Sequence, residues 1–383
     1  MKEGVKWPWI PYEEYRQRID KAKEILAKHG LDAMLLFSPT NWWYYGGWTD
    51  LAQMHNNCWR SAMIVCPDRD PVAVVHGAFR WTHRLTTWIE DVRIWTEVGQ
   101  RDGPTAFYPL FFDSLKNLGL SEKILGIETG PDIDTYLSFD EYNYIKEQLP
   151  KAKIVSADKA IWEQRMVKTP YEIEIIREGC RRACAIIRTA FEAIKPGVSE
   201  VDVHRAFWRA CANYDMLESP NHSTWLLWSS NAKEAGGVIR WITRPVDPII
   251  EVGDQGICDC GPSYKGYQID FQRTFYVGDP PEKQLRLYNI AKEAFLETLD
   301  SIKPGVRVCD IHQSAIESVR KRDPNQLPTI DFAGHSMGLA NHEPPWIRGN
   351  EETIIQPGMV FCVELGAFDI EREVVGGMPE DIV

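Results

Sequence analysis

Two aspartates lie in neighbouring apolar stretches of the segment ICDCGPSYKGYQIDFQRTF, residues 257–275. Asp259 has apolar and cysteine neighbours, and Asp270 follows in a second apolar run beyond a Pro-Ser-Tyr-Lys-Gly turn. The pattern predicts a β-hairpin with one carboxylate in each arm. A buried carboxylate is costly unless it is paired, protonated or bound to a cation. Arg273 could supply a simple ion pair, so these two residues alone leave the choice open.

More residues of metal-ligand type follow towards the C-terminus. DFAGHSMGLANHEPP contains His335 and His342 in a Gly-rich segment, PGMVFCVELGAF contains Glu364 in an apolar strand, and GGMPEDIV contains Glu380 and Asp381. Four carboxylates converging in an interior would repel one another strongly without cations. Hard oxygen ligands with one imidazole suit Mn²⁺, Fe²⁺, Co²⁺ or a catalytic Zn²⁺ pair better than a structural thiolate zinc site. Two such ions can generate hydroxide at neutral pH and polarise a scissile bond.

The bulk properties describe a globular protein rather than a nucleic-acid or membrane binder. The chain has 383 residues, which favours two domains. Its formal net charge of −12 disfavours nucleic acid and anionic membranes as partners. No apolar run is long enough to span a bilayer, and the first residues lack the apolar core of a signal peptide. We expect a cytoplasmic protein whose nine cysteines are reduced and mostly buried.

The sequence predicts helices and strands in two regions, of which the N-terminal one precedes the acids. In the N-terminal part, residues 1–158, a helix is predicted over 12–29 and another over 142–149. Short apolar runs predict strands at 32–38, 61–67, 71–76, 124–129 and 153–158. Alternating strands and helices indicate an α/β domain that ends near Asp158.

The C-terminal part, residues 159–383, contains an internal repeat. IKPGVSEVDVH (194–204) and IKPGVRVCDIH (302–312) each follow one predicted helix and begin another, namely 170–193 then 199–213, and 284–302 then 307–321. We infer two similar halves, each with two helices followed by strands, that share one core. Thr169 is the predicted cap of the first helix, whose predicted apolar stripe is Ile173, Ile176, Cys180, Ala183 and Ile187. The Asp and His of each repeat, Asp202, His204, Asp310 and His312, are assigned a structural role at helix entry.

These motifs resemble the creatinase/aminopeptidase P/prolidase family, peptidase family M24. The family's ordered pattern is Asp, a second Asp eleven positions later, His in a Gly-rich segment, Glu in a strand and Glu in a terminal acidic pair, and the chain is similar over residues 160–383. The resemblance implies an α/β N-terminal creatinase-like domain and an α+β pita-bread C-terminal domain with an internal pseudo-twofold repeat. It also implies a homodimer.

The resemblance assigns roles to the acids and histidines. It implies two divalent metal ions per chain (Mn, Fe, Co or Zn), held by Asp259, Asp270, His335, Glu364 and Glu380. Asp270 and Glu380 would bridge both ions, Asp259 would hold one, and His335 and Glu364 the other. Glu364 would also be the general base for a metal-bridging hydroxide. His342 would contact the substrate or the tetrahedral intermediate, the alternative being a hydrogen bond that stabilises its turn.

The chain differs from the family's peptidases at two positions where those peptidases bind their substrate. The stretch LLWSSNAKEAGGVIRW (226–241) lacks the His that those peptidases carry after a Ser-Gly-Xaa-Asn segment, and only His222, upstream, could replace it. Met378 stands where they carry an Arg two residues before the final Glu. Trp228 and Met378 are the residues that we expect to line the substrate pocket, together with His342.

Three functions remain open at this stage. The first is a dinuclear hydrolase of short peptides, Xaa-Pro peptidase-like or prolidase-like. The second is a hydrolase or lyase of a small cationic or amide metabolite, similar to dimethylsulfoniopropionate lyase or ectoine hydrolase. The third is a non-catalytic pita-bread binding module. The complete set of five matched ligands argues against the third function and against a metal-free creatinase.

Overall fold

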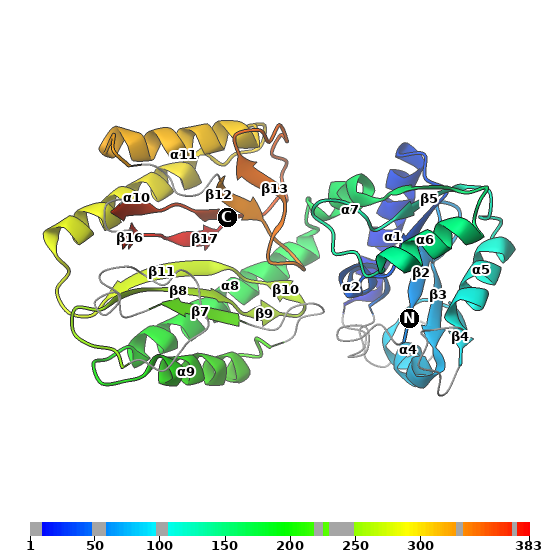
Figure 1. Cartoon of the computed structure of the whole chain (residues 1–383), viewed down its shortest axis with the longest axis horizontal. Coiled ribbons are helices and arrows are strands. Elements are labelled where there is room, and N and C mark those ends of the chain that lie inside the picture. The colour runs from blue at the N-terminus through cyan, green and yellow to red at the C-terminus, as the bar shows by residue number, and fades with distance from the viewer. Residues whose placement is uncertain are drawn as a thin grey trace. The chain divides into compact units, whose positions relative to one another are not determined.

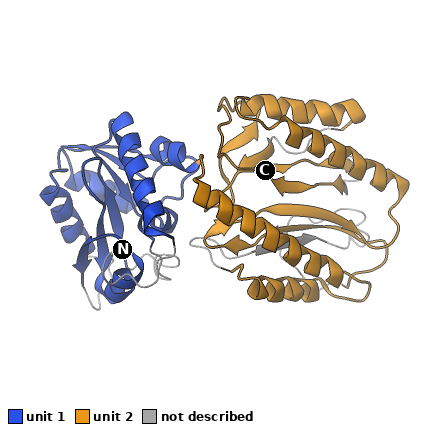
Figure 2. Ribbon diagram, turned by 180° about the vertical axis from the view of Figure 1, so that it is seen from behind, with its two compact units in different colours: residues 1–165 blue, residues 166–383 orange. Residues whose placement is uncertain are grey.

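The computed structural model describes residues 10–47, 59–96, 106–217, 225–229, 249–326, 332–369 and 374–383. Within these ranges, no helix has the length and apolar character that a membrane span requires. The chain divides into two compact units, residues 1–165 and 166–383 (Figure 2). The predicted boundary after Asp158 falls at the start of helix α7 (Asp158–Arg165), which packs on helix α1 (Tyr12–Lys28) of the first unit. Helix α7 therefore belongs to the N-terminal unit.

The first unit is built on a six-stranded sheet with the order β4-β3-β2-β1-β5-β6. All five predicted strands are present, and their bounds are β1 Ala33–Leu36, β2 Ala62–Val65, β3 Val72–His76, β5 Ile124–Ile127 and β6 Lys153–Ser156. Strand β4 (Asp91–Trp95) was not predicted. It pairs at the sheet edge with β3 and is largely accessible, so its sequence DVRIW lacks the apolar run that marks the buried strands.

Helices surround this sheet. They are α1, α2 (Pro39–Gly46), η1 (Gly77–Phe79), α4 (Arg80–Thr86), α5 (Phe107–Asn117), α6 (Phe139–Gln148) and α7. The buried face of α1 consists of the apolar residues that the sequence pattern indicates, Tyr15, Ile19, Ala22, Ile25 and Leu26. A cluster of aromatic and aliphatic side chains from α5 and the central strands forms the core of the unit.

The second unit repeats one pattern twice (Figure 1). Its first half contains α8 (Pro170–Ala193), α9 (Glu200–Asn213), β7 (Trp225–Ser229), β8 (Gln255–Gly261), β9 (Ser263–Tyr264), β10 (Tyr267–Gln268) and β11 (Phe271–Tyr276). Its second half contains α10 (Glu282–Ser301), α11 (Val308–Arg322), β12 (Phe332–Ser336), β13 (Glu343–Arg348), β14 (Phe361–Glu364), β15 (Ala367–Asp369), β16 (Val374–Gly377) and β17 (Glu380–Ile382). The predicted succession of two helices and then strands in each half is confirmed.

Equivalent contacts at the two Lys-Pro-Gly turns confirm the internal repeat. Gly197 and Gly305 both have a positive φ, +88° and +92°. Their backbone N–H groups donate to Ile250 O at 2.8 Å and to Ile355 O at 2.9 Å. Each turn therefore ties the start of a helix to a later strand region in the same way. The acids at the two helix entries are engaged locally, Asp202 with Arg205 and Asp310 with Arg307, both at 2.7 Å, as their structural role requires.

Helix α8 supports the hairpin that carries the two aspartates. Thr169 caps it in a capping box with Glu172. Its buried face is Ile175, Ile176, Gly179, Ala183, Ile186 and Ala190, so the predicted stripe was wrong at Ile173, Cys180 and Ile187, which are only half-buried. The close approach of the hairpin explains the difference, because a Cβ added at Gly179 would lie 2.6 Å from Ile269 Cδ1. A glycine, which hydrophobic periodicity ignores, is thus part of the packing face.

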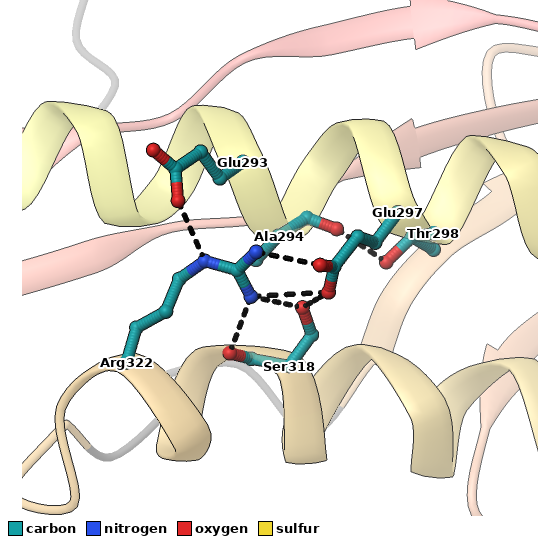
Figure 3. A network of polar contacts seen from close by, with 6 residues as sticks. All are labelled: Glu293, Ala294, Glu297, Thr298, Ser318 and Arg322. Atoms are coloured by element: carbon teal, nitrogen blue, oxygen red, sulfur yellow. Dashed lines mark hydrogen bonds and ion pairs between the residues drawn. The ribbon is translucent and has the colours of Figure 1, made fainter.

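Helices α10 and α11 are clamped by one arginine (Figure 3). Arg322 donates to Glu293 at 3.0 Å and to Glu297 at 2.6 and 3.0 Å, and its Nη1 also reaches Ser318 O and Oγ. Hydrogen bonding to Arg322 lowers the pKa of Glu297 to about 2. Because both carboxylates are exposed, this clamp adds little to the free energy of unfolding.

The sheets of the two halves meet where β11 lies beside β17 (Figure 1). The first half forms the antiparallel sheet β11-β8-β7, and the second forms β13-β12-β14-β17. Strand β17 pairs with β14, so the residues that end the chain are docked within the sheet.

Gly334, immediately before His335, offers a test of this arrangement. Its φ is +137°, and an added Cβ would lie 2.1 Å from the backbone oxygen of Cys362. At Gly305 an added Cβ would meet no atom within 4 Å. We predict that Gly305→Ala lowers the free energy of unfolding by about 1 kcal/mol through backbone strain alone. Gly334→Ala should lower it by about 3 kcal/mol or more, because backbone must also move.

Urea denaturation of the two variants and the parent chain measures the difference. Equal losses in the two variants would contradict the close packing of β12 against β14.

Candidate metal centre

Strand register brings the two aspartates to one face of the first sheet. In the antiparallel pair of β8 and β11, Asp259 lies opposite Gln272. Cross-strand partners project to the same side, as do residues two apart along a strand, so Asp270 shares the face of Gln272 and Asp259. The predicted second hairpin arm is interrupted, because β10 pairs with β9 and Asp270 lies between β10 and β11. Asp270 Oδ2 nevertheless lies 3.7 Å from Nε2 of His335 in β12 of the second sheet.

The second sheet presents its own donors in the same way. His335 of β12 lies opposite Cys362 of β14, and Glu364 of β14 lies opposite Glu380 of β17. Cys362 and Glu364 are two residues apart, so all four side chains emerge on one face. A register slip of one residue in β14 would turn Cys362 and Glu364 away from the other donors.

The donors from the two sheets converge in one buried cluster. The His335 Nε2 atom lies 3.7 Å from Asp270 Oδ2, 3.7 Å from Glu364 Oε1 and 4.0 Å from Glu380 Oε1. Asp259 joins through its electrostatic interaction with Glu364. All five residues are at most 8% exposed. Four of the five residues expected as ligands are therefore brought together around His335 Nε2, and Asp259 is buried close enough to Glu364 for that charge to raise its pKa.

The imidazole of His335 is oriented for coordination through Nε2. Its Nδ1 lies 2.9 Å from the backbone oxygen of Ser336, so Nδ1–H donates there and the Nε2 lone pair faces the carboxylates. Burial lowers the pKa of His335 to about 3, which keeps the ring neutral. A neutral imidazole with its free nitrogen directed at carboxylates is the form that binds a metal ion.

Burial and mutual repulsion oppose ionisation of the four acids. The pKa values of Asp259, Asp270 and Glu380 are raised well above their usual range, first by burial and then by the neighbouring carboxylates. Burial raises the pKa of Glu364 to about 7. Divalent cations among these oxygens would reverse both effects, because they supply the missing positive charge.

Unmatched polar atoms also fit a cation. Among the described residues, the buried atoms Asp259 Oδ1, Asp270 Oδ1 and His335 Nε2 have no hydrogen-bond partner. Buried Glu128 in the first unit provides the contrast, since Ser38 Oγ, Asn41 Nδ2 and the backbone N–H groups of residues 37 and 38 all donate to its carboxylate. These three atoms of the cluster thus lack the hydrogen-bond partners that surround the carboxylate of Glu128. Oxygen and imidazole donors of this kind suit divalent metal ions.

His342 lies at the accessible edge of the cluster. Its ring centroid is 4.2 Å from that of His335, and it is stacked on Trp346 of β13 at 5.4 Å with an interplanar angle of 10°. The side chain is exposed, unlike that of His335. His342 is therefore placed to meet a molecule that approaches the cluster from solvent.

A buried ion pair, which sequence reasoning missed, holds the loop between the two histidines. Glu343 accepts from Lys168 Nζ at 3.0 Å and from the backbone N–H of Ala340 at 3.1 Å, and both charged side chains are 1% exposed. The partners are 175 residues apart in sequence, so no local pattern could have paired them. Together they fix the loop that follows His335.

Cys362 was also missed. Its sulfur lies 3.3 Å from Glu380 Oε1, inside the cluster. The two-residue spacing to Glu364 in an apolar strand could have revealed it, because alternate strand residues share a face.

Of the two other residues expected to line the substrate pocket, the structure describes the side chain of Met378 but not that of Trp228. Met378 is buried, and its backbone N–H donates to Thr274 Oγ1 at 3.1 Å. The backbone of Trp228 in β7 pairs with Cys258 in β8, and the side chain of Trp228 is not among those that the structure describes. The segment 230–241, where the family's additional His was sought, and His222 also lie outside the described residues.

Each of the two units matches the model of a known protein family. Residues 174–383 match the model of metallopeptidase family M24, and residues 18–167 match the creatinase/prolidase N-terminal domain. A creatinase from a Bacillus species is 27% identical over 93% of this chain and 84% of its own length. An Xaa-Pro dipeptidase from Pyrococcus furiosus is 26% identical over 92% of this chain and 91% of its own length.

Solved structures share the fold. A dipeptidase from Pyrococcus horikoshii superposes with a TM-score of 0.78 at 21% identity, covering 95% of this chain and 94% of that one. A prolidase from Thermococcus sibiricus gives a TM-score of 0.79 at 21% identity, covering 96% and 94%. The predicted architecture, a creatinase-like α/β domain followed by a pita-bread domain, is confirmed, as is the assignment to a family of metal-dependent hydrolases. The chain belongs to metallopeptidase family M24.

Proposed function

We propose that this protein is a dinuclear metal-dependent hydrolase that cleaves short peptides at an Xaa-Pro bond, as prolidases do. The observation that carries the proposal is the convergence of four carboxylates and one neutral imidazole, all buried, with unpartnered donor atoms directed into the cluster. The matched Xaa-Pro dipeptidase supports the choice of substrate.

Each donor has a place in the proposed centre. Asp270, which immediately precedes β11 of the first sheet, and Glu380, in β17 of the second, would bridge two ions, and Asp259 would complete one site from β8. His335 and Glu364, whose Nε2 and Oε1 atoms lie 3.7 Å apart, would complete the other. Two divalent ions bound there would lower the pKa of a water molecule and polarise the scissile carbonyl.

The side chains then handle protons and position the substrate. Glu364 accepts a proton from the attacking water, a role that suits a carboxylate whose pKa burial raises to about 7. The exposed His342, held against Trp346, contacts the substrate carbonyl as negative charge develops on its oxygen.

A second candidate is hydrolysis or elimination of a small non-peptide metabolite on the same centre. Met378 favours it, because this buried apolar side chain stands where the family's peptidases carry an Arg. The creatinase among the matched proteins is a relative whose name denotes a small-molecule substrate.

Asp270→Ala tests the bridging role. Removing a carboxylate shared by both ions should reduce bound metal from two ions per chain to fewer than about 0.2, as measured by elemental analysis after dialysis. The control is Asp381→Asn. Asp381 lies next to Glu380 in the chain but pairs with Arg273 at 2.6 Å, so this variant should keep both ions bound. Retention of two ions in Asp270→Ala would disprove the bridging role.

A substrate panel tests the reaction. Purified protein supplied in turn with Mn²⁺, Co²⁺, Fe²⁺ and Zn²⁺ should cleave Xaa-Pro dipeptides, with products measured by chromatography. Glu364→Gln should lower kcat by at least about 100-fold through loss of the base. If no dipeptide is cleaved with any metal while dimethylsulfoniopropionate, creatine or ectoine is consumed, the peptidase proposal fails in favour of the second candidate.

The stability of the metal-free protein should fall as pH rises. The folded-state pKa of Glu364, about 7, exceeds the value of about 4.3 for an unfolded chain, so its stabilising contribution is lost as pH rises towards the folded value. Burial and the neighbouring carboxylates also raise the pKa values of Asp259, Asp270 and Glu380, so their ionisation as pH rises lowers stability in the same direction. His335 has a lowered pKa, so its effect on stability is opposite: stability increases as pH rises, but only below about pH 6.5.

Thermal unfolding between about pH 6.5 and about pH 8.5 measures this effect. We expect Tm to decrease across that range in chelator-treated protein and to be restored by Mn²⁺. The decrease should be smaller in Glu364→Gln, and an unchanged slope in that variant would contradict the assignment of Glu364.

A further inference from the structure

Cys362 belongs to the face that carries the metal donors. It lies opposite His335 in the pairing of β12 with β14 and two residues before Glu364. It is completely buried, and its Sγ atom lies 3.3 Å from Glu380 Oε1 and 3.3 Å from the backbone oxygen of Asp270. The thiol therefore contacts the carboxylate of Glu380 and the main chain of Asp270, the two residues proposed to bridge the ions.

The donor spacing fits one ion. A carboxylate oxygen of Asp270, a ring nitrogen of His335, the Cys362 sulfur and an oxygen of Glu380 all lie within 4.8 Å of one another. Around an ion with a sulfur at about 2.3 Å and oxygen or nitrogen at about 2.0 Å, neighbouring donors are separated by roughly 3–3.5 Å. The separation of 3.3 Å between Cys362 Sγ and Glu380 Oε1 already meets this spacing, whereas His335 Nε2, at 3.7 Å from Asp270 Oδ2 and 4.0 Å from Glu380 Oε1, would move inward when an ion binds.

Independent observations at the same place indicate that a ligand is expected. His335 Nε2 and Asp270 Oδ1 are buried and have no hydrogen-bond partner among the described residues. Both residues belong to the group of four that includes Cys362. Two members of the group that includes the sulfur thus offer donor atoms that hydrogen bonds within the protein do not satisfy.

We propose that Cys362 is a sulfur donor to the metal ion that His335 holds. The inference rests on the proposed metal centre and adds a ligand to it. When the ion binds, the S–H bond breaks, the proton passes to solvent, and the electron pair that remains on sulfur forms the bond to the metal. No oxidant or reductant is needed.

A sulfur donor changes which ions the site prefers. Thiolate is a soft ligand, and it favours Zn²⁺, Co²⁺ and Fe²⁺ over Mn²⁺ relative to an all-oxygen and imidazole site. We therefore expect Cys362→Ser to weaken Zn²⁺ binding by about tenfold or more, with a smaller effect on Mn²⁺.

Absorption spectroscopy of the Co²⁺-loaded protein detects a bond between the Cys362 sulfur and the metal ion directly. Protein loaded with Co²⁺ under anaerobic conditions should show an ultraviolet sulfur-to-cobalt charge-transfer band that titrates with bound metal. The band should be absent in Cys362→Ser. The matched control is Cys260→Ser, another fully buried thiol one residue from an expected ligand, whose sulfur lies 3.7 Å from Phe271 O on the strand face opposite Asp259. That variant should keep the band.

The outcomes separate this inference from the proposed centre. Stoichiometric Co²⁺ without a sulfur band would leave the metal centre standing and overturn the role of Cys362, whose thiol would then only donate a hydrogen bond to Glu380. A band that persists in Cys362→Ser would overturn it as well. Failure to bind any metal would overturn both proposals.

A second measurement needs no variant. X-ray absorption of Zn²⁺-loaded wild-type protein should show a sulfur neighbour at about 2.3 Å. A shell of oxygen and nitrogen alone would disprove the assignment.

Discussion

Electrostatic repulsion among buried carboxylates is the constraint on which this structure depends. Asp259, Asp270, Glu364 and Glu380 occupy one interior cluster, where burial and the neighbouring acids raise the pKa of Asp270 and Glu380 far above their usual range. No protein cation among the described residues is recorded in contact with any of the four carboxylates, and the neutral His335 is the only base in the set. A fold that maintains such an arrangement is built for added positive charge, which divalent metal ions provide.

The surrounding structure serves to hold these groups against their repulsion. Each half of the second unit contributes a sheet whose register directs alternate side chains inward, and each sheet is backed by two helices. Gly179 lets α8 approach the hairpin closely, and Gly334 lets β12 approach β14. Where other buried charges serve structure, the chain pairs them fully, as in the contact between Lys168 and Glu343. In the cluster, by contrast, Asp259 Oδ1, Asp270 Oδ1 and His335 Nε2 are buried without a hydrogen-bond partner among the described residues.

In this chain the expected metal ligands match the family's pattern more fully than the expected substrate-handling residues do. The ligand pattern agrees with that of its family, whereas Met378 and the stretch 226–241 do not match the family's peptidases. A sulfur donor at Cys362 would extend that difference to the choice of metal. The same scaffold can thus keep its hydrolytic centre while the residues around it select a different substrate or ion.

The sequence by itself determined five of the six strands in the first sheet, the internal repeat with two helices in each half, and the five expected ligands. It could do so because the repeat and the spacing of Asp259 and Asp270 are local patterns, and because Thr169, the Lys-Pro-Gly turns and the apolar periodicity act over a few residues. Only the tertiary structure decided the interruption before β11, the pairing of Lys168 with Glu343 and the inward direction of Cys362. These depend on register between strands and on contacts between residues far apart in the chain, which no local pattern encodes. Edge strand β4 and the close approach at Gly179 were likewise decided by packing, because hydrophobic periodicity records neither accessible strands nor the absence of a side chain.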